Sequence, residues 1–122
     1  MKTILIADDE ERIRKIVSDF LKKEGYSVFE SEDGDHTYEI FMQNKNSIDL
    51  IILDIMMPGM NGWEVCRKIR ESSNVPVIML SARSEEYDKL YGFDLGIDDY
   101  VTKPFSPKEL MMRIAAILNR YK

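Results

Sequence analysis

The stretch DLIILDIMMPGMNG, residues 49–62, combines an apolar run, a carboxylate and two turn signals. Leu50-Ile51-Ile52-Leu53 is an unbroken apolar run, which is typical of a strand buried on both faces. The run leads directly into Asp54, and Pro-Gly and Asn-Gly pairs then turn the chain. A buried carboxylate costs free energy unless a partner compensates its charge. Asp54 is therefore either an ordinary turn residue or a residue placed at the end of the strand for its chemistry.

Apolar runs alternate with segments of helical periodicity along the whole chain. The expected strands cover residues 3–7, 27–30, 49–53, 76–80 and 100–102. The expected helical segments include Ile13 to Leu21, Tyr38 to Met42, Val65 to Ile69, Glu85 to Leu95 and Pro107 to Tyr121. Strict alternation of strands and helices predicts an α/β fold, in which a parallel sheet is covered by helices on both faces.

Length and composition narrow the classes of function. A chain of 122 residues fits one domain, and its net charge of −5 argues against binding nucleic acid with its own surface. The single cysteine, Cys66, excludes an internal disulfide framework and a cysteine-based metal site. The first apolar run is too short for a signal peptide, and no run reaches membrane-spanning length. We therefore expect a cytoplasmic protein that makes no membrane contact.

Polar side chains follow four of the expected strands. Asp8 and Asp9 come after the first strand, Asp54 after the third, Ser81 after the fourth and Lys103 after the fifth. In an open parallel sheet the functional crevice lies at the carboxyl ends of the strands, so we expect these side chains to converge. Each one alone has an ordinary interpretation, as a helix cap, a turn former or a solvated lysine. Their coincidence at four strand ends favours a functional pocket.

The predicted pocket suits phosphoryl chemistry. Three clustered carboxylates repel one another, and Mg²⁺ relieves this repulsion because it prefers oxygen ligands. A carboxylate beside Mg²⁺ can attack a phosphoryl group and form an aspartyl phosphate. The metal and Lys103 would neutralise the phosphoryl oxygens, and Ser81 would donate a hydrogen bond to the new phosphate. This interpretation makes Asp54 the residue that is modified.

Four motifs give the chain a family resemblance. They are Ala7-Asp8-Asp9-Glu10, residues 53–62, Leu80-Ser81-Ala82 and residues 96–105. In these motifs the chain resembles the receiver domain of two-component response regulators. The resemblance covers residues 1–122 and implies a flavodoxin-like (βα)5 three-layer sandwich with strand order 2-1-3-4-5. It also implies that Asp54 accepts a phosphoryl group from a sensor histidine kinase, a self-modification without turnover of a metabolite.

The resemblance implies a Mg²⁺ site with four contributors. Asp9 and Asp54 would bind the metal directly, Asp8 through a water molecule, and Met56 through its backbone carbonyl.

The resemblance also implies a response to phosphorylation. Lys103 would pair with the phosphate, and Ser81 and Tyr100 would form the switch pair. The hydroxyl of Ser81 would move toward the phosphate while the ring of Tyr100 turned inward. From the residues alone, Tyr100 is equally well interpreted as a half-buried aromatic residue of the sheet.

The part of the chain after Ser81 most resembles the OmpR/PhoB subfamily. These proteins dimerise through the fourth helix, fifth strand and fifth helix, and carry a C-terminal DNA-binding domain. The resemblance thus implies a homodimer on phosphorylation, and DNA contact only through a domain outside this chain. Candidate residues of the dimer face are the ion pairs Lys89–Glu109 and Asp99–Arg113 and the apolar residues Leu90, Phe93 and Met111. The alternative is a set of ordinary surface charges over a core stripe.

Three other functions fit parts of the pattern. A small Mg²⁺-dependent phosphohydrolase of the haloacid-dehalogenase type needs a second Asp two residues after the nucleophile, where this chain has Met56. A flavodoxin-like cofactor-binding module needs a glycine- or hydroxyl-rich phosphate loop after the first strand, where this chain has Asp8-Asp9-Glu10. A stand-alone receiver that acts by protein–protein contact has the same motifs, so this alternative stays open.

Overall fold

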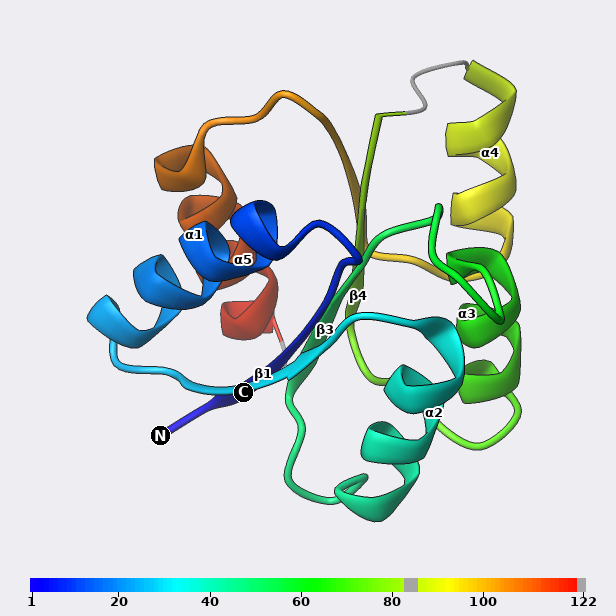
Figure 1. Ribbon diagram of the computed structural model, residues 1–122, viewed down its shortest axis with the longest axis horizontal. Coiled ribbons are helices and arrows are strands. Elements are labelled where there is room, and N and C mark those ends of the chain that lie inside the picture. Colours follow the sequence, from blue (N-terminus) through cyan, green and yellow to red (C-terminus); the bar gives the residue numbers. More distant parts are fainter. Residues whose placement is uncertain (83–85, 121–122) are drawn as a thin grey trace.

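A computed structural model describes residues 1–82 and 86–120 of the chain. Strands and helices alternate strictly over these residues (Figure 1). Their bounds are β1 (Thr3–Ala7), α1 (Glu11–Lys23), β2 (Ser27–Ser31), α2 (Gly34–Gln43), β3 (Leu50–Leu53), α3 (Gly62–Arg70), β4 (Val77–Ser81), α4 (Glu86–Asp94), β5 (Asp99–Thr102) and α5 (Pro107–Arg120). The strands form one parallel sheet in the order β2-β1-β3-β4-β5, which confirms the expected flavodoxin-like arrangement.

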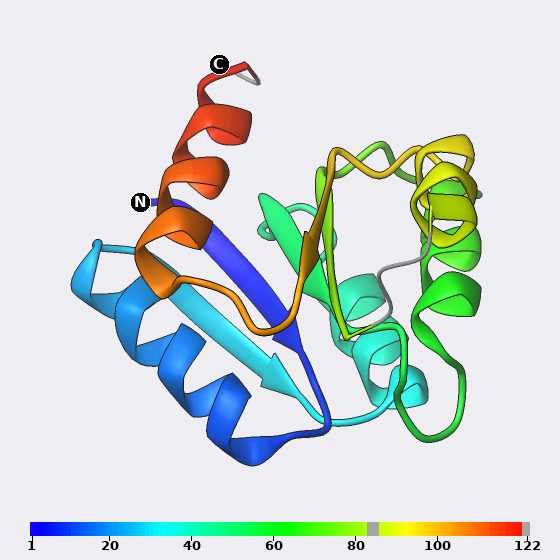
Figure 2. The same ribbon diagram turned by 90° about the horizontal axis from the view of Figure 1, so that it is seen from above.

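The sheet separates two apolar layers. Helices α1 and α5 cover one face, and α2, α3 and α4 cover the other, as Figures 1 and 2 show. Successive side chains of a strand point to opposite faces. Accordingly, Ile4 and Ile6 of β1 pack with the core under α1 and α5, whereas Leu5 and Ala7 pack with the core on the other face. Because both faces are covered, the three inner strands β1, β3 and β4 consist mostly of apolar residues, whereas the edge strands β2 and β5 also carry polar ones.

Several expected strand ends shift by one residue, and α2 and α3 begin at Gly34 and Gly62, before the apolar residues from which they were predicted. Pro76 has no amide hydrogen to donate, so β4 begins at Val77. Asp49 lies before β3, and its side chain accepts a hydrogen bond from the Thr3 amide at 2.8 Å. Glu85 and Tyr121, the expected limits of two helices, lie outside the described residues. Among the helices of the described residues, none is both long and apolar enough to cross a membrane.

Candidate functional site

Strand register brings the three predicted carboxylates together. Ala7 of β1 lies opposite Leu53 of β3, so the next residue of each strand, Asp8 and Asp54, lies at the same edge of the sheet. Carboxylate oxygens of Asp8, Asp9 and Asp54 all lie within 4.8 Å of one another. Asp8 and Asp54 are buried, with exposed fractions of 0% and 3%, while Asp9 is exposed. The sheet thus places two buried carboxylates beside one that reaches solvent.

Lys103 directly follows the edge strand β5, and its side chain reaches this cluster. Its amide donates to the carbonyl oxygen of Ser81 at 2.7 Å, which aligns the end of β5 with the end of β4. Its Nζ atom lies 2.9 Å from Asp8 Oδ2 and 3.6 Å from Asp54 Oδ2. A third carboxylate, that of Glu10, lies 3.2 Å from the same Nζ atom. The single ammonium group of Lys103 therefore forms ion pairs with three carboxylates.

The electrostatics of the pocket favour an added cation. Burial and the negative charge of Asp8 raise the pKa of Asp54 to about 7, although Lys103 and the Met56 amide act in the opposite direction. Burial lowers the pKa of Lys103, but its hydrogen bond to Asp8 and the nearby carboxylates outweigh burial and raise this pKa. Lys103 thus stays charged and still leaves the carboxylates undercompensated. A divalent cation would supply the missing positive charge.

The donor atoms fit Mg²⁺. Asp8, Asp9 and Asp54 offer only oxygen atoms, the ligands that this cation prefers. The amide of Met56 donates to Asp54 Oδ1 at 3.2 Å, so the backbone of Met56 lies at the same pocket. The side chain of Met56 is 59% exposed. Met56 therefore contacts the pocket through its backbone amide, and the use of its carbonyl as a metal ligand stays a prediction.

The loop between β3 and α3, which carries Met56, is fixed at both sides by glycines. The amide of Gly34 donates to the carbonyl of Pro58 at 3.1 Å, and a Cβ atom on Gly34 would collide with the Met60 carbonyl oxygen. A Cβ atom on Gly62 would collide with the backbone carbonyl oxygen of Asp54, the phosphoacceptor candidate. These close approaches hold the loop against α2 and the end of β3.

The predicted switch residues end neighbouring strands. Ser81 is buried at the end of β4, and Tyr100 of β5 is 8% exposed, so its ring is turned inward in this structure. The Tyr100 ring lies 6.4 Å from the Trp63 ring, between ring centroids. Trp63 in turn meets Tyr91 of α4 edge to face at 5.0 Å. The three aromatic rings connect α3, α4 and β5.

The charged residues of the predicted dimer face have partners within the chain. Arg113 donates to Asp99 Oδ2 at 2.8 Å and to Glu109 Oε1 at 3.1 Å. The ammonium of Lys89 lies 5.9 Å from the centroid of the Tyr100 ring. Asp99–Arg113, expected between two subunits, is thus an ion pair inside one subunit.

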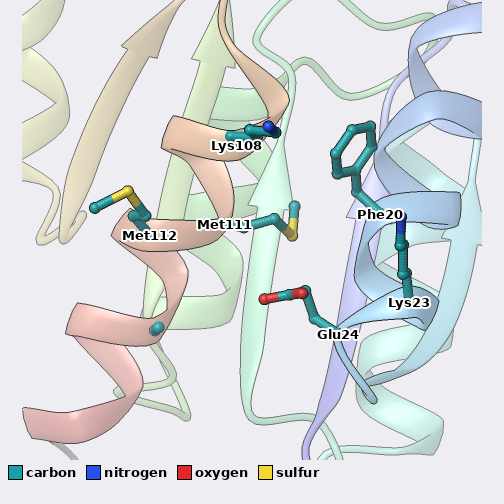
Figure 3. Close-up of a pocket in the computed structure, with 7 residues that line it drawn as sticks. Phe20, Lys23, Glu24, Lys108, Met111 and Met112 are labelled. Carbon is teal, nitrogen blue, oxygen red and sulfur yellow. The ribbon is translucent and has the colours of Figure 1, made fainter.

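The apolar residues of the predicted dimer face divide into two groups. Leu90 and Phe93 of α4 are 59% and 50% exposed, as a contact surface requires. Met111 is only 6% exposed and points from α5 toward α1 (Figure 3), because it lies on the core side of its helix. Its neighbour Met112 is 73% exposed. Met111 is therefore not part of the exposed surface on α4 and α5.

A groove between α1 and α5 was not expected from the sequence. Its volume is about 410 Å³, and it shares no residue with the carboxylate pocket. The residues that line it are Phe20, Lys23, Glu24, Lys108, Met111, Met112 and Ala115 (Figure 3).

The contact between Glu10 and Lys103 was not predicted from the sequence. The available signals were the place of Glu10 in the first motif, directly after Asp8 and Asp9, and its position before α1, where Ser, Thr, Asp or Asn is the usual helix cap.

Comparisons with known proteins agree with this geometry. The family model described as response regulator receiver domain matches residues 4–115. Transcriptional regulatory protein ResD of Bacillus subtilis is 48% identical over 117 residues, which are 96% of this chain and 48% of the relative. Transcriptional regulatory protein SrrA of Staphylococcus aureus is 44% identical with the same coverage. The chain spans about half the length of these relatives.

Solved structures give the same result. The Francisella response regulator 1452 receiver domain has a TM-score of 0.91 and 34% identity, with full coverage of both chains. The BeF3-activated DrrB receiver domain has a TM-score of 0.86 and 37% identity, with 98% of each chain covered. A role in signalling rather than in metabolism follows from these matches. The match over most of its length shows that this chain belongs to the response regulator receiver domain family.

Proposed function

We propose that this chain is a cytoplasmic phosphorylation switch in which Asp54 accepts a phosphoryl group from a sensor histidine kinase. The observation that supports this proposal is the convergence of Asp8, Asp9 and Asp54 with the ammonium of Lys103 at one edge of the sheet. A metabolic phosphohydrolase is disfavoured, since the residue two positions after Asp54 is Met56, whose side chain points to solvent.

The proposed transfer is a single displacement at phosphorus. A carboxylate oxygen of Asp54 attacks the phosphohistidine of the kinase, so that an O–P bond forms while the P–N bond breaks. The imidazole leaves with the electron pair of the broken bond. Lys103, which lies 3.6 Å from Asp54, offsets the charge on the transferred group. Ser81 then donates a hydrogen bond to the phosphate.

The reaction is proposed to depend on Mg²⁺. Asp9 and Asp54 would bind the ion directly, Asp8 through water and Met56 through its carbonyl. When bound, the ion would offset the negative charge of both the carboxylates and the phosphoryl oxygens. The solved relative described as BeF3-activated supports this chemistry, because beryllium fluoride mimics a phosphoryl group on a carboxylate.

The proposed output is transcription through a DNA-binding domain outside this chain. The names of ResD and SrrA support it, as does the fact that the chain spans about half of their length. Phosphorylation would act through Ser81 and Tyr100 on a homodimer formed by α4, β5 and α5. The proposed face comprises Lys89, Leu90, Phe93, Asp99, Glu109 and Arg113. Exposure of Leu90 and Phe93 supports this choice of face.

Phosphoryl uptake from a small donor tests the proposal without the kinase. The protein is incubated with acetyl phosphate and Mg²⁺, and its intact mass is measured. One added phosphoryl group is expected, and Asp54→Asn or EDTA should abolish it. Equal uptake by Asp54→Asn, or none by the unaltered protein with either acetyl phosphate or a phosphorylated kinase, would overturn the proposal.

A further inference from the structure

Glu10 holds an unusual position at the start of α1. It is the residue directly before the helix, yet its side chain makes no capping hydrogen bond to the helix. Glutamate is also not among the residue types that are preferred at the position before a helix. Instead, Glu10 Oε1 accepts a hydrogen bond at 3.2 Å from Lys103, which is 93 residues away in the sequence. The direction of this side chain is thus explained by Lys103 and not by the helix.

The ammonium group of Lys103 lies at unequal distances from its three carboxylate partners. Its Nζ atom lies 2.9 Å from Asp8, 3.2 Å from Glu10 and 3.6 Å from Asp54. The two nearer carboxylates, those of Asp8 and Glu10, share the single positive charge of this ammonium group with Asp54. The phosphoacceptor candidate is therefore the most distant partner. Asp8 and Glu10 both follow β1, so together they hold the lysine toward that strand.

We propose that Glu10 is a positioning residue that restrains phosphoryl transfer, because it competes with the phosphoryl group on Asp54 for Lys103. This inference rests on the function proposed above. Glu10 also has a side chain that is 55% exposed, so its negative charge lies where an anionic donor must approach. Both effects act in the same direction. Loss of this one charge should make the site a better acceptor.

Glu10→Gln tests the inference because it removes the charge and keeps the size of the side chain. Glu11→Gln is the matched control, since it removes the same charge from the adjacent exposed residue, which lies in a groove with Arg14 and Lys15. Two quantities are measured for each protein with Mg²⁺ present. They are the calorimetric affinity for beryllium fluoride and the initial rate of phosphoryl uptake from acetyl phosphate.

We expect Glu10→Gln to raise both quantities about 2- to 5-fold, the size of effect that a half-exposed ion pair gives. Glu11→Gln should match the unaltered protein. A residue with only a structural role would lower the melting temperature without a gain in affinity, so thermal unfolding is recorded in parallel. Equal values for the two variants, or a loss in Glu10→Gln, would overturn the role of Glu10 and leave the phosphoacceptor intact. Absence of uptake by the unaltered protein from acetyl phosphate and also from a phosphorylated kinase would overturn both.

Discussion

Lys103 and Asp54 meet at 3.6 Å although their strands, β5 and β3, are separated by β4. The lysine side chain therefore crosses the end of β4 to reach the phosphoacceptor candidate. It is only 11% exposed, so water screens its charge weakly. A largely shielded ammonium group at this place can stabilise negative charge that develops during phosphoryl transfer.

Replacement of Lys103 should slow phosphoryl uptake strongly. Lys103→Gln keeps a polar side chain but removes the charge that faces Asp54. Loss of one such group costs on the order of 100-fold in rate at comparable sites. The initial rate with acetyl phosphate, followed by intact mass, measures the effect. Lys108→Gln, at an exposed lysine of α5, is the control and should leave the rate unchanged. A Lys103→Gln rate within twofold of the control would contradict this role.

Removal of the Asp54 carboxylate should stabilise the metal-free protein. Its pKa is raised from 3.8 to about 7 by burial and by Asp8, so ionisation is less favourable in the folded chain than in the unfolded chain. This unfavourable contribution is absent below the lower pKa, grows as the pH rises between the two values, and is complete above pH 7. In EDTA at pH 8, Asp54→Asn should raise the free energy of unfolding by about 1–3 kcal/mol.

Chemical denaturation at pH 8 and pH 4 checks this prediction. The gain should be largely lost at the lower pH, because pH 4 lies close to the pKa of 3.8 in the unfolded chain and the carboxyl group is protonated in the folded chain. Glu39→Gln, at an exposed residue of α2, serves as the control and should change little at either pH. A destabilised Asp54→Asn protein at pH 8 would show that the carboxylates are already well compensated.

Mg²⁺ should raise the melting temperature, and Asp9 should be needed for this effect. An ion that binds only the folded chain stabilises it in proportion to the logarithm of its concentration. Asp9 is exposed, so Asp9→Asn should leave the metal-free melting temperature nearly unchanged while it weakens the dependence on Mg²⁺. Glu11→Gln should retain the full dependence. Thermal unfolding over a Mg²⁺ series measures this, and equal slopes for both variants would exclude Asp9 as a ligand.

A charge on the exposed face of α4 should block dimerisation. Leu90→Asp places a carboxylate in the surface formed with Phe93, so beryllium fluoride should no longer convert the protein to a dimer. Met112→Asp makes the same change at a residue of α5 that lines the α1–α5 groove, and it should still dimerise. Sedimentation velocity with Mg²⁺ and beryllium fluoride gives the oligomeric state. A dimer that survives Leu90→Asp and is lost with Met112→Asp would place the interface on α1 and α5.

The positions of the strands, and of the polar residues that follow them, were predictable from the sequence. Apolar runs define the strands. The backbone of a parallel sheet brings residues such as Asp8 and Asp54 to one edge, whichever rotamers their side chains adopt. Side-chain partners were harder to predict, because they depend on rotamers and tertiary distances. The contact from Glu10 to Lys103 and the pairing of Asp99 with Arg113 inside one subunit are of this kind.

Helical periodicity also did not predict which single side chains of a helix are buried and which are exposed. Met111 and Met112 are adjacent in α5, and only the packing against α1 shows that the first is buried and the second exposed. The contact of Trp63 with Tyr91 likewise depends on how α3 and α4 lie together. Sequence patterns place a residue on an element more reliably than they place its side chain against a neighbour.

The chemical location of the phosphoryl group shows directly whether Asp54 is the phosphoacceptor. Borohydride reduces an aspartyl phosphate to homoserine and leaves free carboxylates unchanged. After reaction with acetyl phosphate and Mg²⁺, reduction and trypsin digestion, the peptides that cover residues 3–12 and 46–67 are fragmented, which distinguishes Asp54 from Asp8, Asp9 and Asp49. Homoserine is expected at residue 54 alone. Homoserine at residue 8, 9 or 49, with aspartate retained at residue 54, would contradict it.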